Sequence, residues 1–201
     1  NIVVKEEEHT ADAARPDFVK KIVDPINALK GDLLPVSAFN GREDGTWDNG
    51  TAAYEKRGIA VNVPEWKIEK CNQCAYVCPH AVIRPFLATE EEAAASGVEW
   101  KQGLGETKEY KFRIQISPMD CTGCSNCVDV CPAKDKALVM RPLEEQMPQQ
   151  KNWDYITKNI GYKQVVDKTK SVKNLQFAQP LFEFSGACAG CGETPYIKAI
   201  S

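Results

Sequence analysis

The chemistry of this sequence is concentrated in two runs of cysteines. The second run, residues 121–132, reads C-x2-C-x2-C-x3-C-P, a spacing typical of thiolates that ligate iron–sulfur clusters. The first run, residues 71–79, has the same pattern without its leading cysteine. The two runs therefore predict a pair of iron–sulfur sites, one of them a thiolate short. They contain seven of the nine cysteines, namely Cys71, Cys74, Cys78, Cys121, Cys124, Cys127 and Cys131.

The three-residue gap before the last cysteine of each run predicts how the ligands are shared. This gap is expected to place that cysteine at the start of a helix, where it points away from its own loop. In two-cluster ferredoxins such a cysteine binds the other cluster. Gly123 is expected to ease the turn that directs backbone N–H groups toward the cluster. The predicted ligand sets are Cys78, Cys121, Cys124 and Cys127 for a complete 4Fe-4S cluster, and Cys71, Cys74 and Cys131 for an incomplete one.

The second cluster lacks a fourth thiolate, because Ile68 stands where the repeat would place the missing cysteine. Isoleucine cannot bind iron. The site is then expected to hold a 4Fe-4S cluster with water or a carboxylate such as Glu69 at the open iron, a 3Fe-4S cluster, or no cluster. A loss of three residues from the recorded sequence would also explain the gap. A bound cluster is favoured over an empty site.

Zinc is the alternative metal, since it also accepts four thiolates. Two interleaved loops with apolar residues between their cysteines, such as Tyr76 and Val128, favour iron–sulfur clusters instead. The odd number of cysteines and their C-x2-C spacing also disfavour a disulfide framework. His80 directly follows the first run and is expected to be an ordinary helix residue rather than a group that modulates a cluster.

The same elements flank both runs: a strand, the ligand loop, a short helix and a second strand. This repeat predicts an α+β fold, a two-cluster bacterial-ferredoxin-like (βαβ)2 domain over residues 58–143, flanked by extended linker segments. An insertion at residues 88–109 separates the two copies. Within it, Thr89 and the acids after it predict a helix start, and later glycines end the helix. The expected strands are residues 58–63, 81–86, 110–116 and 136–143.

The remaining segments are predicted to be linkers. Residues 1–57 form an N-terminal arm with one helix that begins at Pro16. Residues 144–181, rich in Gln, Lys and Asn with little periodicity, are interpreted as a wrapping linker. The apolar face expected for the N-terminal helix consists of Phe18, Ile22, Ile26 and Leu29.

Composition excludes several classes of protein. A formal net charge of −3 argues against nucleic-acid binding, which usually needs a basic excess. No apolar stretch approaches the length of a membrane span, and the first residues lack the apolar region of a signal peptide. Because thiolates held for metal require a reducing compartment, the sequence predicts a cytoplasmic protein that binds neither nucleic acid nor membrane.

A third site is predicted near the C-terminus. Cys188 and Cys191 lie in glycine-rich sequence and can supply half of a further cluster. Thr194 and Pro195 then predict the N-cap and first position of a helix. Residues 182–201 are accordingly assigned to the start of a separate, truncated domain, and the chain is expected to be part of a larger protein.

Longer motifs give this chain a specific resemblance. It resembles pyruvate:ferredoxin (flavodoxin) oxidoreductase, namely its two-cluster ferredoxin-like domain and the start of its thiamine-diphosphate domain. The resemblance covers nearly all of residues 16–201. In that family the first run is complete, so this chain departs from it by one C-x2 unit. The motifs that carry the resemblance are the two cysteine runs and residues 34–39, 50–59, 63–66, 168–174 and 182–196.

The resemblance implies an iron–sulfur electron-transfer segment of an enzyme that oxidatively decarboxylates pyruvate with coenzyme A. Electrons would pass from thiamine diphosphate through a proximal cluster, for which Cys188 and Cys191 supply two ligands, and then through the two ferredoxin-type clusters. Glu193 would lie near the thiamine diphosphate, whose magnesium motif is absent here. The implied partners are the rest of a homodimeric parent enzyme and ferredoxin or flavodoxin. The chain alone is not expected to be catalytic.

Two other classes of function stay open from the sequence. A stand-alone ferredoxin-like carrier or electron-input subunit would use Cys188 and Cys191 as a docking or auxiliary metal site. A zinc-stabilised interaction module is the third class. Iron and sulfide content separates zinc from the other two.

Overall fold

The protein is described by a computed structural model that covers residues 15–48, 51–70 and 76–201. The predictions for Cys71 and Cys74 therefore lie outside the described residues. The chain divides into two compact units, residues 1–56 and 57–201. Each unit is described by itself. The domain boundaries expected from the sequence stay a prediction.

The smaller unit contains the predicted N-terminal helix, which is confirmed. A π-helical turn, η1 (Val19–Val23), continues into α1 (Asp24–Asn27). The expected apolar face is wrong in part: Ile22 is buried as predicted, whereas Leu29 is 94% exposed and lies past the helix with a positive φ of 56°. A π-turn has a longer hydrogen-bond spacing than an α-helix, so it rotates later residues off the expected face. Three short 3-10 turns follow, η2 (Gly31–Leu33), η3 (Val36–Phe39) and η4 (Thr51–Tyr54).

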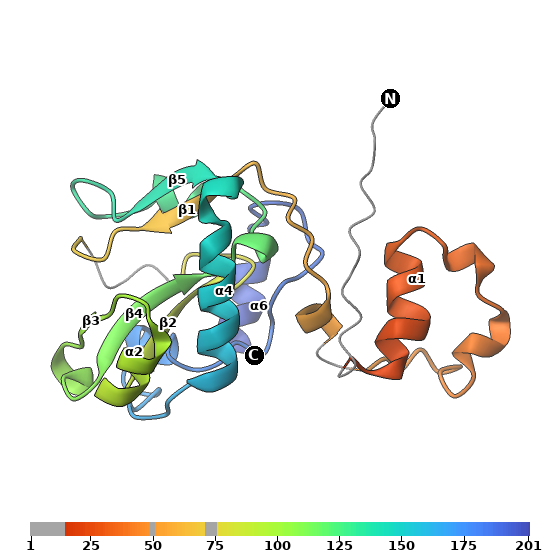
Figure 1. The fold of residues 1–201 in the computed structure, drawn as a ribbon, viewed down its shortest axis with the longest axis horizontal. Helices are drawn as coiled ribbons and strands as arrows, with labels where there is room; N and C mark the ends of the chain where they lie inside the picture. The colour runs from red at the N-terminus through yellow and green to blue at the C-terminus, as the bar shows by residue number, and fades with distance from the viewer. Residues whose placement is uncertain (1–14, 49–50, 71–75) are drawn as a thin grey trace. The chain divides into compact units, whose positions relative to one another are not determined.

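The larger unit is built on two antiparallel sheets (Figure 1). Each sheet pairs a strand that flanks the first cysteine run with a strand that flanks the second, so the two runs are held close together. In the first sheet, β1 (Asn62–Trp66) pairs with β5 (Leu138–Pro142). In the second, β4 (Lys111–Ile116) lies between β2 (Ile83–Ala88) and β3 (Lys101–Gln102).

All four expected strands are present, with shifted boundaries in the first copy. β2 begins two residues later than expected, because Ala81 has a φ of 55°, which is incompatible with a strand. β1 likewise begins late: Gly58, with a φ of 58°, turns the chain and donates its N–H to the Met119 carbonyl. The strict alternation of apolar and polar side chains over residues 110–116 predicted the bounds of β4 to within one residue.

The short helix expected after each cysteine loop is present in the second copy. It is α3 (Asn126–Asp129), which follows the 3-10 turn η6 (Pro118–Asp120) and lies inside the second cysteine run. The expected position of Cys131 at a helix start is wrong. Cys131 lies just past the C-cap of α3, because the helix begins within the ligand loop and is a single turn long.

Residues 88–109 begin with the predicted helix, α2 (Glu90–Ser96). Thr89 forms a reciprocal capping box with Glu92, and Gly97 ends the helix with a φ of 65°. The segment then contributes β3 to the second sheet and closes with the 3-10 turn η5 (Gly105–Thr107). It therefore extends the sheet instead of lying wholly outside it.

A long helix within the expected wrapping linker is a feature that the sequence analysis missed. α4 (Leu143–Asn159) runs past both sheets (Figure 1) and packs against β1, β4 and β5. Half of its buried positions are glutamines, so the apolar periodicity that usually reveals a helix is weak. Pro148 inside the helix weakens the pattern further. The buried residues are Gln146, Gln150, Trp153 and Ile156.

The main core of the larger unit contains cysteines as well as aliphatic and aromatic residues. Cys78, Cys121, Cys127 and Cys131 are all buried among residues such as Leu138. A second cluster, formed by Phe86, Trp153 and Ile156, joins α4 to β2. None of the described helices has the length and apolar character needed to span a membrane.

Candidate metal centre

Four cysteines from the two runs line one cavity. Cys78 precedes β2, Cys121 and Cys124 come from the loop between η6 and α3, and Cys127 lies on α3. All seven described cysteines have free thiols. In the described part of the chain, no three His, Cys, Asp or Glu side chains converge as ligands of a single metal ion would. The four thiols surround a cavity, and four thiolates are the ligand set of a 4Fe-4S cluster.

The backbone around the cavity is shaped to donate hydrogen bonds to sulfur. Gly123 has a φ of 69° and donates its N–H to Cys121 Sγ at 3.4 Å. A Cβ at this position would lie 3.1 Å from the Asn62 carbonyl oxygen, so a glycine is needed both for conformation and for space. Val82 donates its N–H to Cys78 Sγ at 3.4 Å. Such N–H groups favour the negative charge of thiolate and sulfide.

Burial strongly opposes charge on these thiols in the absence of a cation. It raises the pKa of Cys121 and of Cys127 to about 12, with the neighbouring cysteines adding to the effect. Burial also raises the pKa of Cys78. Thiolates at these positions therefore need a positively charged partner, and the iron of a cluster is such a partner. The donor set fits an iron–sulfur cluster.

His80 is not the helix residue that was expected. It lies in the turn before β2, is 2% exposed and lines the same cavity as the four cysteines. Burial lowers the pKa of its imidazole, so the ring is neutral near pH 7. Its Nδ1 lies 3.3 Å from Ser185 Oγ. No local pattern indicates that His80 and Ser185 meet, because 105 residues separate them.

Of the three cysteines predicted for the incomplete cluster, only Cys131 lies among the described residues. It is buried and accepts a hydrogen bond from the Ala137 N–H at 3.2 Å. Cys131 is not part of the cavity lined by the four cysteines. Its role as a ligand of a second cluster stays a prediction.

The loop that carries Cys188 and Cys191 packs beside the four-cysteine cavity. Cys188 is exposed and Cys191 is half-buried, and their loop is closed by a hydrogen bond from the Cys191 N–H to the Cys188 carbonyl. At Gly190, which has a φ of 72°, a Cβ would lie 3.2 Å from the Cβ of Cys124. The absence of a side chain at Gly190 thus allows this loop to approach Cys124 closely. The backbone N–H groups of Glu193 and Thr194 lower the pKa of Cys191.

Helix α6 (Thr194–Ile200) follows this loop, as expected, but its cap differs from the prediction. Glu193 occupies the N-cap, and Thr194 is the first helical residue. The Thr194 hydroxyl makes no capping bond, since it donates to the carbonyl of Cys191 at 3.5 Å instead. Pro195 remains in the first turn, where its missing N–H costs nothing.

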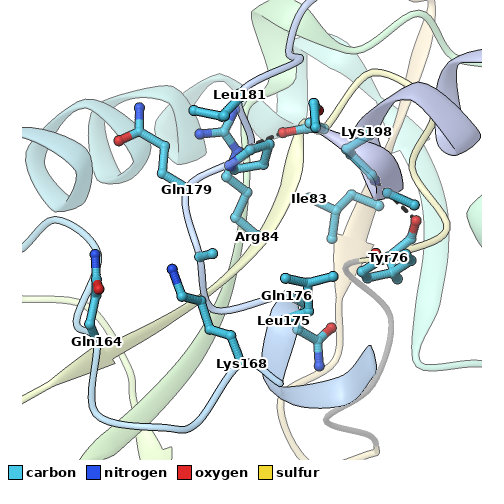
Figure 2. A pocket seen from close by; sticks show the side chains of 15 residues that line it. Tyr76, Ile83, Arg84, Gln164, Lys168, Leu175, Gln176, Gln179, Leu181 and Lys198 are labelled. Carbon is cyan, nitrogen blue, oxygen red and sulfur yellow. Dashed lines mark hydrogen bonds between the residues drawn. The ribbon is translucent and has the colours of Figure 1, made fainter. Parts of the chain in front are cut away.

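Lys198 on α6 is a site residue that the sequence analysis missed. Its partly buried ammonium donates hydrogen bonds to the carbonyl oxygens of Cys78, at 2.6 Å, and Tyr76, at 3.0 Å. Figure 2 shows Lys198 pointing toward Tyr76 at the wall of a neighbouring pocket of about 360 Å³. Lys198 therefore fixes the backbone that carries one predicted ligand.

Arg84 on β2, also missed, ties the C-terminal segment (residues 182–201) to the sheet. Its guanidinium, 4% exposed, pairs with Glu183 and donates to the Tyr162 hydroxyl. It also lies over the rings of Trp153 and Phe184, at 5.0 and 5.1 Å. The Phe184 N–H in turn donates to the His80 carbonyl at 3.0 Å. These contacts place the C-terminal segment against the wall of the cavity.

Comparisons with known proteins agree with this site. Residues 69–134 match the profile of a 4Fe-4S dicluster domain. Residues 5–60 match a profile described as a domain of unknown function. The chain therefore contains an iron–sulfur domain of the two-cluster kind, within a mixed α and β structure.

Relatives of the chain narrow the class. It is 52% identical over 191 residues to a pyruvate-flavodoxin oxidoreductase of Enterobacter agglomerans and 53% identical over 193 residues to a pyruvate:ferredoxin oxidoreductase of Moorella thermoacetica. In both cases 92% of this chain aligns with 16% of the relative. A pyruvate dehydrogenase [NADP(+)] of Cryptosporidium parvum is 48% identical over 192 residues, which are 92% of this chain and 10% of the relative. The predicted resemblance is confirmed: the chain is homologous to one segment of these pyruvate oxidoreductases and spans about a sixth of the first two.

Proposed function

We propose that this chain is the electron-transfer segment of a pyruvate, or 2-oxoacid, oxidoreductase. The observation that carries the proposal is the cavity lined by Cys78, Cys121, Cys124 and Cys127, with the Cys188 loop packed beside it. The names of the relatives support pyruvate as the substrate of the parent enzyme. The chain itself would carry electrons and would not bind pyruvate.

A 4Fe-4S cluster bound by these four cysteines supplies reversible one-electron transfer. The residues of the chain hold it in place and control its surroundings. Gly123 and Val82 donate N–H groups to the thiolates, which favours the added negative charge of the reduced state. The buried apolar neighbours Val82 and Ile83 keep water from the cavity. Rigid, dry surroundings of this kind lower the cost of moving charge.

The finer architecture is also proposed. Residues 58–143 would form the (βαβ)2 domain, with residues 88–109 as its insertion. Cys71, Cys74 and Cys131 would bind the second cluster, as 4Fe-4S or 3Fe-4S. The position of Cys131 supports this ligand set, because Cys131 is buried but does not line the first cavity. Its Sγ accepts a backbone N–H, as two sulfurs of the first site do.

The two cysteines that lie outside the two runs would connect the chain to its parent enzyme. Cys188 and Cys191 would provide two ligands of a proximal cluster, and Glu193 would lie near thiamine diphosphate and its magnesium. The close approach of Gly190 to Cys124 supports an electron path between the two sites. The external acceptor would be ferredoxin or flavodoxin, and the parent would be a cytoplasmic homodimer.

The test is to measure iron and acid-labile sulfide in the purified chain, together with electron paramagnetic resonance. About eight irons per chain indicate two full clusters, about seven indicate one 3Fe-4S cluster, and about four indicate one empty site. Cys78→Ala should remove the signal of the complete cluster, although Cys78 belongs to the incomplete run. Cys188→Ala is the matched control and should leave that signal intact. A chain that binds zinc and no iron would overturn the proposal, and loss of only the other cluster would overturn the crossed ligand set.

A further inference from the structure

The cavity lined by the four cysteines also contains two polar atoms without partners. Across the described residues, His80 Nε2 and Thr122 Oγ1 are the buried side-chain nitrogen or oxygen atoms that lack a hydrogen-bond partner. Both residues line this same cavity. A buried donor without an acceptor carries a free-energy cost, so two of them at one place call for a shared explanation.

The tautomer of His80 sets which ring nitrogen can donate a hydrogen bond. The Ser185 hydroxyl lies 3.3 Å from Nδ1. The backbone carbonyls of Ser185 and Cys188 also lie near the ring and oppose the lowering of its pKa. In the tautomer in which Nδ1 accepts from the Ser185 hydroxyl, the ring carries its proton on Nε2, the atom that has no partner. A hydroxyl such as that of Thr122 rotates freely and can donate as well. In that tautomer both unpartnered atoms are donors.

Sulfur is the acceptor that this cavity offers. The polar atoms of the other lining side chains are the sulfurs of Cys78, Cys121, Cys124 and Cys127, the hydroxyl of Ser125 and the thioether of Met140. Thiolate and sulfide are acceptors only, and a bound cluster brings both. We propose that His80 Nε2–H and Thr122 Oγ1–H donate hydrogen bonds to sulfur atoms of the cluster that the four cysteines hold. This inference rests on the proposed function.

Such bonds have a defined consequence for electron transfer. A reduced cluster carries one more negative charge than an oxidised one, so a hydrogen bond to its sulfur is stronger in the reduced state. The two side chains therefore raise the reduction potential of this cluster. Ser185 acts through His80 and is a positioning residue. The Phe184 N–H bond to the His80 carbonyl and the Arg84 Nε bond to the Ala81 carbonyl, at 2.7 Å, hold the turn in place.

The experiment compares His80→Leu, Thr122→Val and the wild-type chain, each loaded with its clusters. Iron and sulfide content report whether the cluster is present, and a redox titration followed by electron paramagnetic resonance reports its potential. We expect full loading and a more negative potential in both variants. A tenfold change in the ratio of reduced to oxidised cluster corresponds to about 59 mV for one electron. His80→Gln, which retains an N–H donor, should recover part of the shift.

Thr107→Val is the matched control for Thr122→Val. The Thr107 side chain is also buried, but its hydroxyl donates to the Leu104 carbonyl and it does not line the cavity. This control should leave the potential unchanged. Full loading with an unchanged potential in both His80→Leu and Thr122→Val would overturn the inference.

A measurement on the wild-type chain avoids dependence on the folding of a variant. With 15N-labelled histidine, the reduced cluster should show a hyperfine coupling to an imidazole nitrogen, and exchange into D2O should replace a coupled proton. The absence of both couplings in a fully loaded chain would also overturn the inference. If the wild-type chain holds no cluster on the four cysteines, the proposed function itself fails, so the two failures are distinguishable.

Discussion

The ammonium group of Lys198 donates a hydrogen bond to the backbone carbonyl oxygen of Cys78 at 2.6 Å, across 120 residues of sequence. A second bond joins the same ammonium to the Tyr76 carbonyl. Helix α6 therefore holds the backbone of a predicted cluster ligand from outside the cavity. The two cysteine runs do not position Cys78 by themselves.

Lys198→Met should destabilise the chain by about 2 to 4 kcal/mol, because it leaves two carbonyls in a partly buried site without a charged donor. Methionine retains the bulk of the side chain, so the loss is one of hydrogen bonding. Urea denaturation measures the free energy of unfolding. Lys151→Met, at an exposed position on α4, is the control and should change it by less than about 0.5 kcal/mol. Equal effects of the two substitutions would contradict this account.

Arg84→Lys should cost about 2 to 4 kcal/mol even though the charge is kept. A lysine cannot bond Glu183, Tyr162 and the Ala81 carbonyl together, nor stack on the surrounding rings in the same way. Urea denaturation again measures the change in the free energy of unfolding. The control is Arg141→Lys, whose partner Glu65 lies at the surface, and it should cost less than about 1 kcal/mol.

The seven described cysteines should differ sharply in reactivity when the chain is free of clusters. At pH 8, iodoacetamide should modify Cys191 well before Cys121 or Cys127. Backbone N–H groups lower the pKa of Cys191, whereas burial raises the pKa of the other two to about 12. Mass spectrometry of the digested chain gives the order. Similar rates in folded and urea-unfolded protein would contradict the buried site.

The same raised pKa values predict how stability depends on pH without clusters. An unfolded cysteine loses its proton near pH 8.5, roughly. The folded thiols of Cys121 and Cys127 keep theirs up to about pH 12. Their contribution to folding is therefore fully present below the unfolded pKa and is lost as pH rises through the folded pKa. The free energy of unfolding should fall over this range, and Cys121→Ala with Cys127→Ala should flatten the fall.

Gly123→Ala should reduce both stability and cluster content. Its φ of 69° disfavours alanine, and the added Cβ would lie 3.1 Å from the Asn62 carbonyl oxygen. The expected cost is about 1 to 3 kcal/mol. Gly192→Ala is the control, since its φ is not in the left-handed region and a Cβ there would meet no atom within 4 Å. Unchanged iron content in Gly123→Ala would contradict the role given to this turn.

Local patterns predicted much of the fold. The alternation of residues 110–116 and the capping signal at Thr89 depend only on neighbouring residues, and both elements are present. The spacing of the cysteines predicted the four that line one cavity. Helix α4 escaped prediction because Gln146 and Gln150 occupy buried positions that usually hold apolar residues.

The contacts that close the site could not be predicted in the same way. Lys198 and Arg84 look like ordinary surface cations in the sequence, and only folding brings them to Cys78 and Glu183. Similarly, the position of His80 depends on Ser185, far along the chain. Contacts between residues that lie far apart in the sequence produce no periodic pattern from which they could be predicted.

The C-terminal segment has a consequence for the order of events during synthesis. A ribosome-bound chain that has emerged through Cys131 already carries Cys78, Cys121, Cys124 and Cys127, whereas Ser185 and Lys198 have not yet been made. Assembly factors would therefore meet these thiols while one wall of the cavity is still missing. Emergence of the C-terminal segment then supplies that wall, so the folding of this segment onto the cavity is the step after which a delivered cluster becomes sheltered from solvent and oxidants.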